Sequence, residues 1–101
     1  MTWKVVVNTK AEQEIKKMIK KRTLSNDDFL VIKQWIMLVE KYGPSRLLDS
    51  KFWNDHELIR ETKWKNCRSS SFSYSGRIIY KIINNKIIVE VLRITNNHDY
   101  K

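Results

Sequence analysis

Apolar residues recur with two different periods along the chain, and the change of period separates a helical part from a strand part. The short β-branched run from Trp3 to Val7 predicts a strand. Apolar residues then recur every three to four positions over residues 9–22 and again between Ser25 and Gly43, which predicts two amphipathic helices. From Trp64 onward the pattern is typical of strands.

The ends of both predicted helices carry capping signals. Thr9 and Glu12 have the spacing of a capping box, so we expect Thr9 to cap the first helix. Ser25 precedes two acidic residues, which are favoured in the first turn of a helix. Gly43 and Pro44 then end the second helix. The short link between the two helices predicts an antiparallel helical hairpin.

Three further strands are predicted over residues 64–72, 77–83 and 86–94. A four-residue loop, Ser73–Gly76, separates the first two, and a two-residue turn at Asn84 and Asn85 joins the last two. Residues 45–62 have no strong period and predict a connecting segment with one helical turn. The order β-α-α-β-β-β indicates an α+β fold, a helical hairpin packed on a mainly antiparallel four-stranded sheet, with residues 1–101 forming a single domain.

The two loop lengths set the register of the predicted sheet. The two-residue turn places Tyr80 opposite Val89, on the face that packs against the helices. The four-residue loop places Arg68 opposite Lys81. We therefore expect Arg68, Arg77 and Lys81 to share the face opposite the helices. That face also carries an apolar patch, which favours a binding partner and consists of Ile79, Ile88 and Leu92.

The net charge of the chain limits the classes of function that it can have. The 101 residues include 20 Lys and Arg against 11 Asp and Glu, a formal charge of +9, which predicts a phosphate-bearing or acidic partner. Seven of the basic residues lie between Arg60 and Lys86, against the single acid Glu61. No window approaches the roughly 18 apolar residues of a membrane span, and no apolar signal core opens the chain, so we expect a cytoplasmic protein with no membrane partner. The single Cys67 excludes an internal disulfide.

Neither a metal site nor a cofactor is expected. His56 and His98 are far apart in sequence, and no ligand pair has metal-binding spacing. With 2 glycines the chain has no glycine loop to hold a phosphate group. The remaining candidate reaction is metal-free cleavage of RNA, in which the 2′-hydroxyl of the RNA itself is the nucleophile. That reaction needs a base, an acid and a cation that bears the charge on the phosphorane.

The chain offers candidates for each of these roles. Arg68 and Arg77 suit the cation role, because a guanidinium matches phosphate oxygens and stays charged. His98 titrates near neutral pH, and Tyr100 can donate a proton or stack on a base. Two simpler interpretations stay open: His98 is a surface residue near a frayed end, and the cations only keep the protein soluble.

Four segments together resemble the RelE/ParE toxin superfamily, in particular its RelE-like members of the YoeB and HigB type: Trp64–Arg68, Gly76–Ile82, Val89–Ile94 and His98–Tyr100. The resemblance implies the toxin of a type II toxin–antitoxin pair. It implies a metal-independent endoribonuclease that cuts mRNA in the ribosomal A site by 2′-hydroxyl attack and so inhibits translation. It also implies a cognate antitoxin that contributes an acidic or amphipathic segment.

The resemblance also assigns residues. It implies that Arg77 supports the transition state, that Arg68 is the basic position of the preceding strand, and that His98 and Tyr100 are tail residues of the site. A glutamate used by YoeB-like members has no clear match here, and His56 and Glu57 are its neighbouring candidates. Two alternatives are a ParE-like gyrase inhibitor and a relative that only binds RNA or its antitoxin. The basic residues expected to bind RNA are Arg60, Lys63, Lys65 and Lys81.

Overall fold

The structure is a computed structural model that describes residues 3–59, 62–83 and 88–96. This part of the chain contains two α-helices, three short 3₁₀ helices and five strands. In chain order they are β1 (Lys4–Val7), α1 (Thr9–Lys20), α2 (Asn26–Tyr42), η1 (Pro44–Asp49), η2 (Lys51–Trp53), β2 (His56–Glu57), η3 (Thr62–Trp64), β3 (Arg68–Ser71), β4 (Arg77–Ile82) and β5 (Ile88–Thr95).

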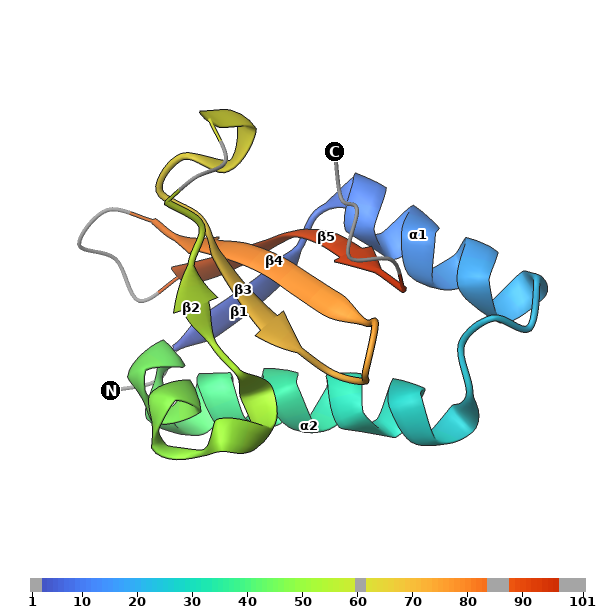
Figure 1. Ribbon diagram of the computed structural model, residues 1–101, viewed down its shortest axis with the longest axis horizontal. Coiled ribbons are helices and arrows are strands. Elements are labelled where there is room, and N and C mark those ends of the chain that lie inside the picture. The colour runs from blue at the N-terminus through green and yellow to red at the C-terminus, as the bar shows by residue number, and fades with distance from the viewer. Residues whose placement is uncertain (1–2, 60–61, 84–87, 97–101) are drawn as a thin grey trace.

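The strands form one sheet in the order β1-β5-β4-β3-β2. β1 runs parallel to β5, and the other neighbouring strands are antiparallel. Helices α1 and α2 run in opposite directions from their short link and bury their apolar sides in one core with the sheet (Figure 1). The predicted α+β fold is confirmed, with five strands instead of four. The additional strand, β2, has only two residues, which is too short for an alternating pattern to show in the sequence.

The N-terminal cap of α2 is the one predicted, whereas that of α1 is not. Ser25 accepts a hydrogen bond from the Asp28 N–H at 3.0 Å. For α1 the cap is Asn8, whose side-chain oxygen accepts from the Ala11 N–H at 2.8 Å. The predicted capping box on Thr9 is therefore wrong by one residue. Asparagine is a stronger N-cap than threonine, which accounts for the difference.

The end of α2 is confirmed at Gly43. Its φ angle is +89°, and its N–H donates to the Val39 carbonyl at 2.8 Å. A Cβ atom at this position would lie 2.6 Å from Nε1 of Trp3, the residue just before β1. Glycine is thus required both by the backbone conformation and by the close approach of the indole.

The hairpin of β3 and β4 differs from its prediction by one residue. The Phe72 N–H donates to the Gly76 carbonyl at 3.2 Å, so three residues separate the paired positions. Arg68 is consequently opposite Tyr80, not opposite Lys81. A Cβ on Gly76 would lie 2.4 Å from the Phe72 ring, so glycine makes room for the buried phenylalanine in this register. Since a slip of one residue exchanges the two faces of a strand, Arg68 lies on the helix-covered face.

The hairpin of β4 and β5 also differs from its predicted register, but the residues from Tyr80 to Ile82 keep their predicted faces. Tyr80 is opposite Val91 instead of Val89, a slip of two residues that leaves the predicted core face unchanged. A bulge at Leu92 then shifts the remaining pairs, so that Arg77 is opposite Thr95. The predicted turn at Asn84 and Asn85 lies outside the described residues.

A second, smaller core covers part of the sheet face opposite the helices. Leu58, Trp64 and Cys67 are buried there against Ile79, and Leu92 packs on them. The predicted exposed apolar patch is therefore wrong for Ile79, which is 0% exposed. The segment between β2 and β3 provides the cover. The strand predicted over residues 64–72 is therefore wrong in its first part, because Thr62–Trp64 form η3 and the strand begins at Arg68.

Candidate functional site

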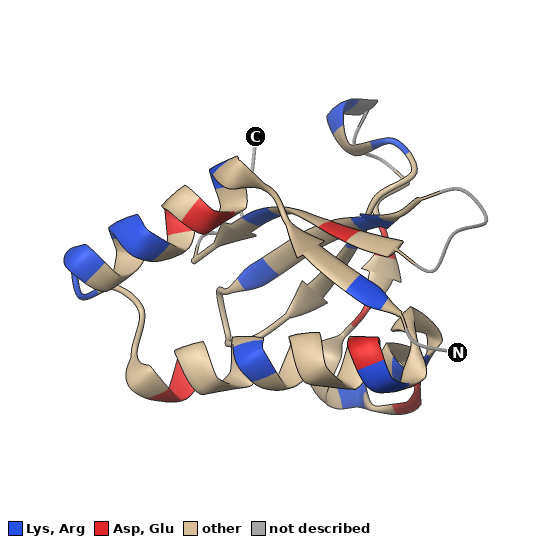
Figure 2. Ribbon diagram, turned by 180° about the vertical axis from the view of Figure 1, so that it is seen from behind, with Lys and Arg blue, Asp and Glu red and all other residues tan. Residues whose placement is uncertain are grey.

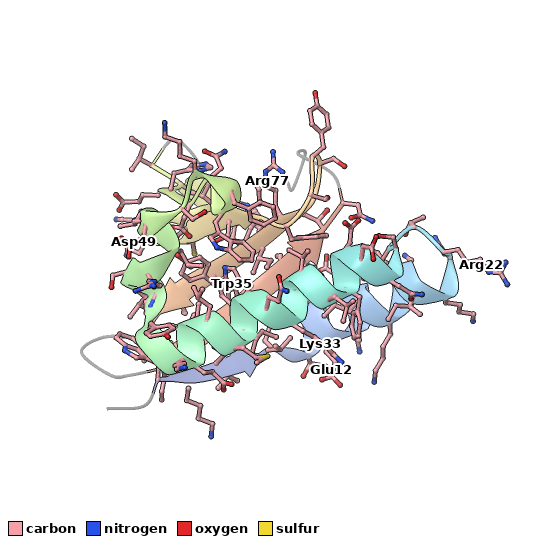
Figure 3. The ribbon with its side chains drawn as sticks, turned by 90° about the horizontal axis from the view of Figure 1, so that it is seen from below. Glu12, Arg22, Lys33, Trp35, Asp49 and Arg77 are labelled. Carbon is pink, nitrogen blue, oxygen red and sulfur yellow. The ribbon has the colours of Figure 1, made fainter. Side chains whose placement is uncertain are left out.

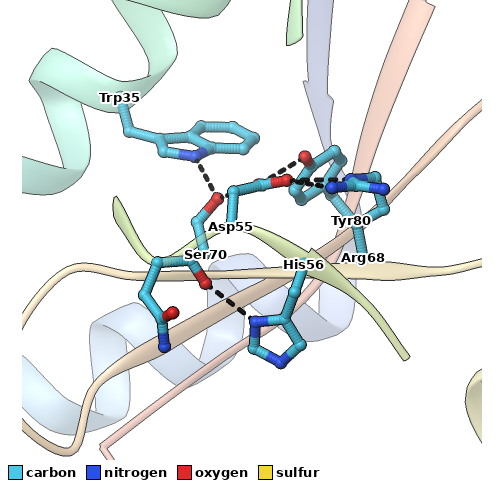
Figure 4. A network of polar contacts seen from close by, with 7 residues as sticks. Trp35, Asp55, His56, Arg68, Ser70 and Tyr80 are labelled. Carbon is cyan, nitrogen blue, oxygen red and sulfur yellow. Dashed lines mark hydrogen bonds and ion pairs between the residues drawn. The ribbon is translucent and has the colours of Figure 1, made fainter. Parts of the chain in front are cut away.

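A buried carboxylate, Asp55, is the centre of the main polar network (Figure 4). Its side chain is 1% exposed. Arg68 donates to Oδ1 from Nε at 2.8 Å and from Nη2 at 2.7 Å. Ser70 and Tyr80 each donate a hydroxyl hydrogen to Oδ2 at 2.6 Å, and Trp35 Nε1 donates to the Ser70 oxygen at 2.9 Å. The network therefore ties the segment after η2 to β3, β4 and α2.

The network also fixes protonation states. Burial, together with the charge of Asp55 and its hydrogen bond, raises the pKa of the Tyr80 phenol. Burial by itself would lower the pKa of Arg68, but the hydrogen bond and charge of Asp55 prevail and raise it. At neutral pH the phenol stays protonated and the guanidinium stays charged. The Trp35 ring, which points from α2 toward the sheet, meets the Tyr80 ring edge-on at 5.1 Å (Figure 3).

Arg77 lies at the start of β4, on the face opposite the helices. Its Nη1 donates to three carbonyls of the preceding loop, those of Ser73 at 3.3 Å, Tyr74 at 3.1 Å and Gly76 at 2.8 Å. Its backbone is opposite Thr95 at the end of β5. These contacts hold the guanidinium against the loop that precedes β4, while the pairing with Thr95 puts the Arg77 backbone beside the end of β5. In sequence, His98 follows Thr95 by three residues, a span of about 11 Å at most.

The structure separates the two arginines that the sequence analysis placed together. Arg68 is on the helix-covered face and forms an ion pair with Asp55, whereas Arg77 is on the opposite face. The expectation that Arg68 shares a surface with Arg77 and Lys81 is therefore wrong for Arg68. It holds for Lys81, which is four residues from Arg77 on β4 and so about 13 Å away on the same face.

Two of the predicted RNA-binding lysines lie together. Lys65 and Lys81 line a cavity of about 320 Å³ with Asn66, Ile82 and Ile83. Lys63 is not among the residues that line this cavity, and its ammonium lies 5.3 Å from the centre of the Trp64 ring. Figure 2 shows that Lys and Arg are also spread over both α-helices, so the positive charge is not confined to this face. Arg60, His98 and Tyr100 lie outside the described residues.

β2 carries the two candidates for the role of the YoeB-type glutamate, on different faces. His56 is opposite Ser69 and shares the face of Arg77, whereas Glu57 is opposite Arg68 on the helix-covered face. His56 is exposed, and its Nδ1 lies 2.8 Å from the Asn54 carbonyl (Figure 4). Because a carbonyl only accepts, Nδ1 is the donor in this contact. His56 is thus the candidate that lies on the same surface as Arg77.

Sequence reasoning missed Asp55. Its partners lie 13 to 25 residues further along the chain, and no local pattern marks it. Among residues 3–59, 62–83 and 88–96, no group of three or more His, Cys, Asp or Glu side chains is placed so that it could hold a metal ion. No helix within those ranges has the length and hydrophobicity needed to cross a membrane.

The structure resembles those of several toxins. One is a metal-bound toxin from Helicobacter pylori, with a TM-score of 0.73, 14% identity and 100% coverage of both chains. Another is the DinJ–YafQ toxin–antitoxin complex from Escherichia coli, with a TM-score of 0.69, 17% identity, and 93% of this chain and 91% of the other covered. A third is the YoeB–YefM complex from Staphylococcus aureus, with a TM-score of 0.62, 7% identity, and 94% and 97% covered.

These similarities confirm the predicted resemblance at the level of the fold. The structural neighbours are RelE-like toxins of toxin–antitoxin systems, and the chain has their fold over its whole length or nearly so. No protein-family model matches the sequence, and no curated protein sequence matches it. The similarity shown is therefore one of fold, at sequence identities of 7% to 17%.

Proposed function

We propose that this chain is the toxin of a toxin–antitoxin pair and a metal-independent endoribonuclease that cuts mRNA in the ribosomal A site. The observation that carries the proposal is the pairing of Arg77 with Thr95. This pairing puts the backbone of Arg77 beside the strand end from which the sequence runs on to His98 and Tyr100. The RelE-like fold supports the same assignment.

The proposed reaction is attack of the RNA 2′-hydroxyl on the adjacent phosphorus. His98 takes the 2′ proton as the base, and the 2′ oxygen forms a bond to phosphorus. Arg77 bears the negative charge that develops on the phosphorane oxygens. The bond to the 5′ oxygen breaks, that oxygen takes up a proton, and the products are a 2′,3′-cyclic phosphate and a free 5′-hydroxyl. Tyr100 stacks on a base or relays this proton.

The lysines are proposed to bind the RNA backbone away from the reacting phosphate. Lys65 and Lys81 line one cavity, and Lys81 is about 13 Å from Arg77 along β4. Lys63 and Arg60 are proposed to bind the RNA backbone as well. We assign Arg68 a different role from the one the resemblance implies, because its guanidinium contacts a buried carboxylate on the other face. In our proposal Arg68 supports the fold, and Arg77 acts on the phosphate.

The proposed partners follow from charge and fold. A domain with a formal charge of +9 is suited to mRNA and ribosomal RNA, and to an antitoxin segment that is acidic or amphipathic. Two of the structures that resemble it are complexes of a toxin with its antitoxin. We propose a cognate antitoxin for this chain on those grounds, and a cytoplasmic site of action.

The test is primer extension on mRNA from cells that briefly express the wild-type chain or one of three variants. Arg77→Ala and His98→Ala should abolish cuts within translated codons. Arg46→Ala is the matched control, because Arg46 is half exposed in η1, where it contacts the surface carboxylate of Asp49 and the ring of Tyr42. Arrested growth without cuts, accompanied by altered DNA supercoiling, would overturn the nuclease and favour the gyrase-inhibitor alternative.

A further inference from the structure

The last part of β5 extends beyond its neighbour β1. The parallel pairing ends at Val7 and Val91, and the Asn8 N–H makes a final bond to the Val91 carbonyl at 3.0 Å. The chain then turns into α1, while β5 continues to Thr95. Residues 92–95 thus have β4 along one edge and α1, in place of a strand, along the other.

Glu14 of α1 occupies the edge that β1 leaves open. Its Oε1 accepts from the Ile94 backbone N–H at 3.2 Å, as a carbonyl of a neighbouring strand would. Its Oε2 accepts from the Arg93 guanidinium, at 2.7 Å from Nε and 2.6 Å from Nη2. Both side chains are largely buried, at 20% and 16% exposed. One carboxylate therefore fixes both the backbone and a side chain of the strand end.

A second contact lies just beyond the strand. The Asn96 side-chain nitrogen donates to the Thr23 carbonyl, in the link that follows α1, at 2.6 Å. The strand end is thereby attached to α1 and its link at two points, Glu14 and Thr23. On its other edge the same strand end pairs with β4, where Thr95 is opposite Arg77. The attachments to α1 therefore help to set where Thr95 and Asn96 lie relative to Arg77 at the start of β4.

We propose that Glu14 is a positioning residue for RNA cleavage, which holds the end of β5 in register beside Arg77 in place of a missing strand. This inference rests on the proposed nuclease function, in which His98 follows Asn96 by two residues. Reaction rates depend steeply on such placement, since a shift of 1 Å can cost about a hundredfold. If the contacts only stabilised the fold, their loss would change the melting temperature and leave the rate per folded molecule unchanged.

The test compares Glu14→Gln with Glu12→Gln. Both residues are on α1 and both changes remove one negative charge, but Glu12 is exposed, and its ion pair among the described residues is with Lys16, at 3.4 Å. Cleavage of a defined mRNA is followed by primer extension in a translation extract, below the melting temperature of each variant and normalised to folded protein. We expect Glu14→Gln to lower kcat by about tenfold or more with KM within about twofold, and Glu12→Gln to change neither beyond about twofold.

A spectroscopic measurement on the free protein separates the two possible failures. The imidazole NMR signals of His98 should move in Glu14→Gln and stay in place in Glu12→Gln, while His56 serves as the internal reference. An unchanged kcat and an unmoved His98 signal in Glu14→Gln would overturn the inference. Absence of cleavage by the wild-type chain would overturn the proposed function instead. The His98 signals would then show only whether Glu14 affects the position of the chain after β5.

Discussion

Replacing Asp55 by alanine should destabilise the protein far more than replacing an exposed aspartate in a similar pair. Asp55 is 1% exposed and accepts hydrogen bonds from three side chains, whereas Asp49 is 67% exposed and pairs with Arg46 at 3.7 Å. The Asp55→Ala variant leaves the Arg68 charge and the Tyr80 hydroxyl without their buried acceptor. Breaking a buried pair from one side costs about 3–5 kcal/mol, while an exposed pair contributes about 0–1 kcal/mol.

The measurement is urea unfolding followed by circular dichroism. With a slope of about 1.5 kcal/mol/M, Asp55→Ala should lower the midpoint by about 2–3 M, and Asp49→Ala by well under about 1 M. A domain of this size has about 5–15 kcal/mol of stability, so at the lower end of that range the first variant is close to unfolding. Asp55→Asn, which keeps an acceptor oxygen, provides an intermediate variant that remains measurable.

A double-mutant cycle identifies the partner responsible. Arg68→Ala leaves a buried carboxylate without its cation, and the double variant removes both charges together. The double variant should therefore be less destabilised than the sum of the two single variants. Equal midpoint shifts for Asp55→Ala and Asp49→Ala, or a cycle that is additive within about 0.5 kcal/mol, would refute the reasoning.

Two further predictions concern pH and salt. Burial and Asp55 raise the pKa of Tyr80 in the folded state, so the stability that this phenol contributes is complete below its unfolded pKa of about 10 and is lost as the pH rises through its higher folded value. Melting temperatures measured from pH 8 to 11 should fall more steeply for the wild-type chain than for Tyr80→Phe, and equal slopes would contradict this. A Lys65→Gln, Lys81→Gln variant should bind single-stranded RNA more weakly, with a salt dependence reduced by about 1.4 units of the log–log slope. Unchanged salt dependence would place the RNA elsewhere.

The ends of α2 could be predicted because their causes are local. Ser25 accepts from an amide three residues away, and Gly43 adopts a backbone conformation that glycine favours. The cap of α1 was misplaced by one residue because Asn8 and Thr9 are both capable of capping. The apolar periods of β4 and β5 also predicted the core face as far as Val91, since alternation survives a slip of two residues, whereas the bulge at Leu92 brings Ile94 to that face against the alternation.

The polar contacts could not be predicted, because each depends on packing between distant segments. Glu14 reaches Ile94 across 80 positions of sequence, and Asp55 reaches Tyr80 across 25. Neither carboxylate differs locally from the solvent-exposed acids of the same chain. Glu14 differs from those acids because it lies beside the end of β5, and Asp55 because it lies beside β3 and β4. Both surroundings exist only once the sheet has formed.

The register of β3 shows how a small packing contact decides the proposed chemistry. The sequence predicts a four-residue loop that pairs Phe72 with Arg77, whereas in the structure three residues separate Phe72 from its partner Gly76. Gly76 selects the shorter loop, because only a residue without a Cβ leaves room for the buried Phe72 ring. That choice turns Arg68 toward Asp55 and leaves Arg77 on the opposite face. A single van der Waals contact thereby assigns one arginine to the fold and leaves the other in place for the proposed phosphate chemistry.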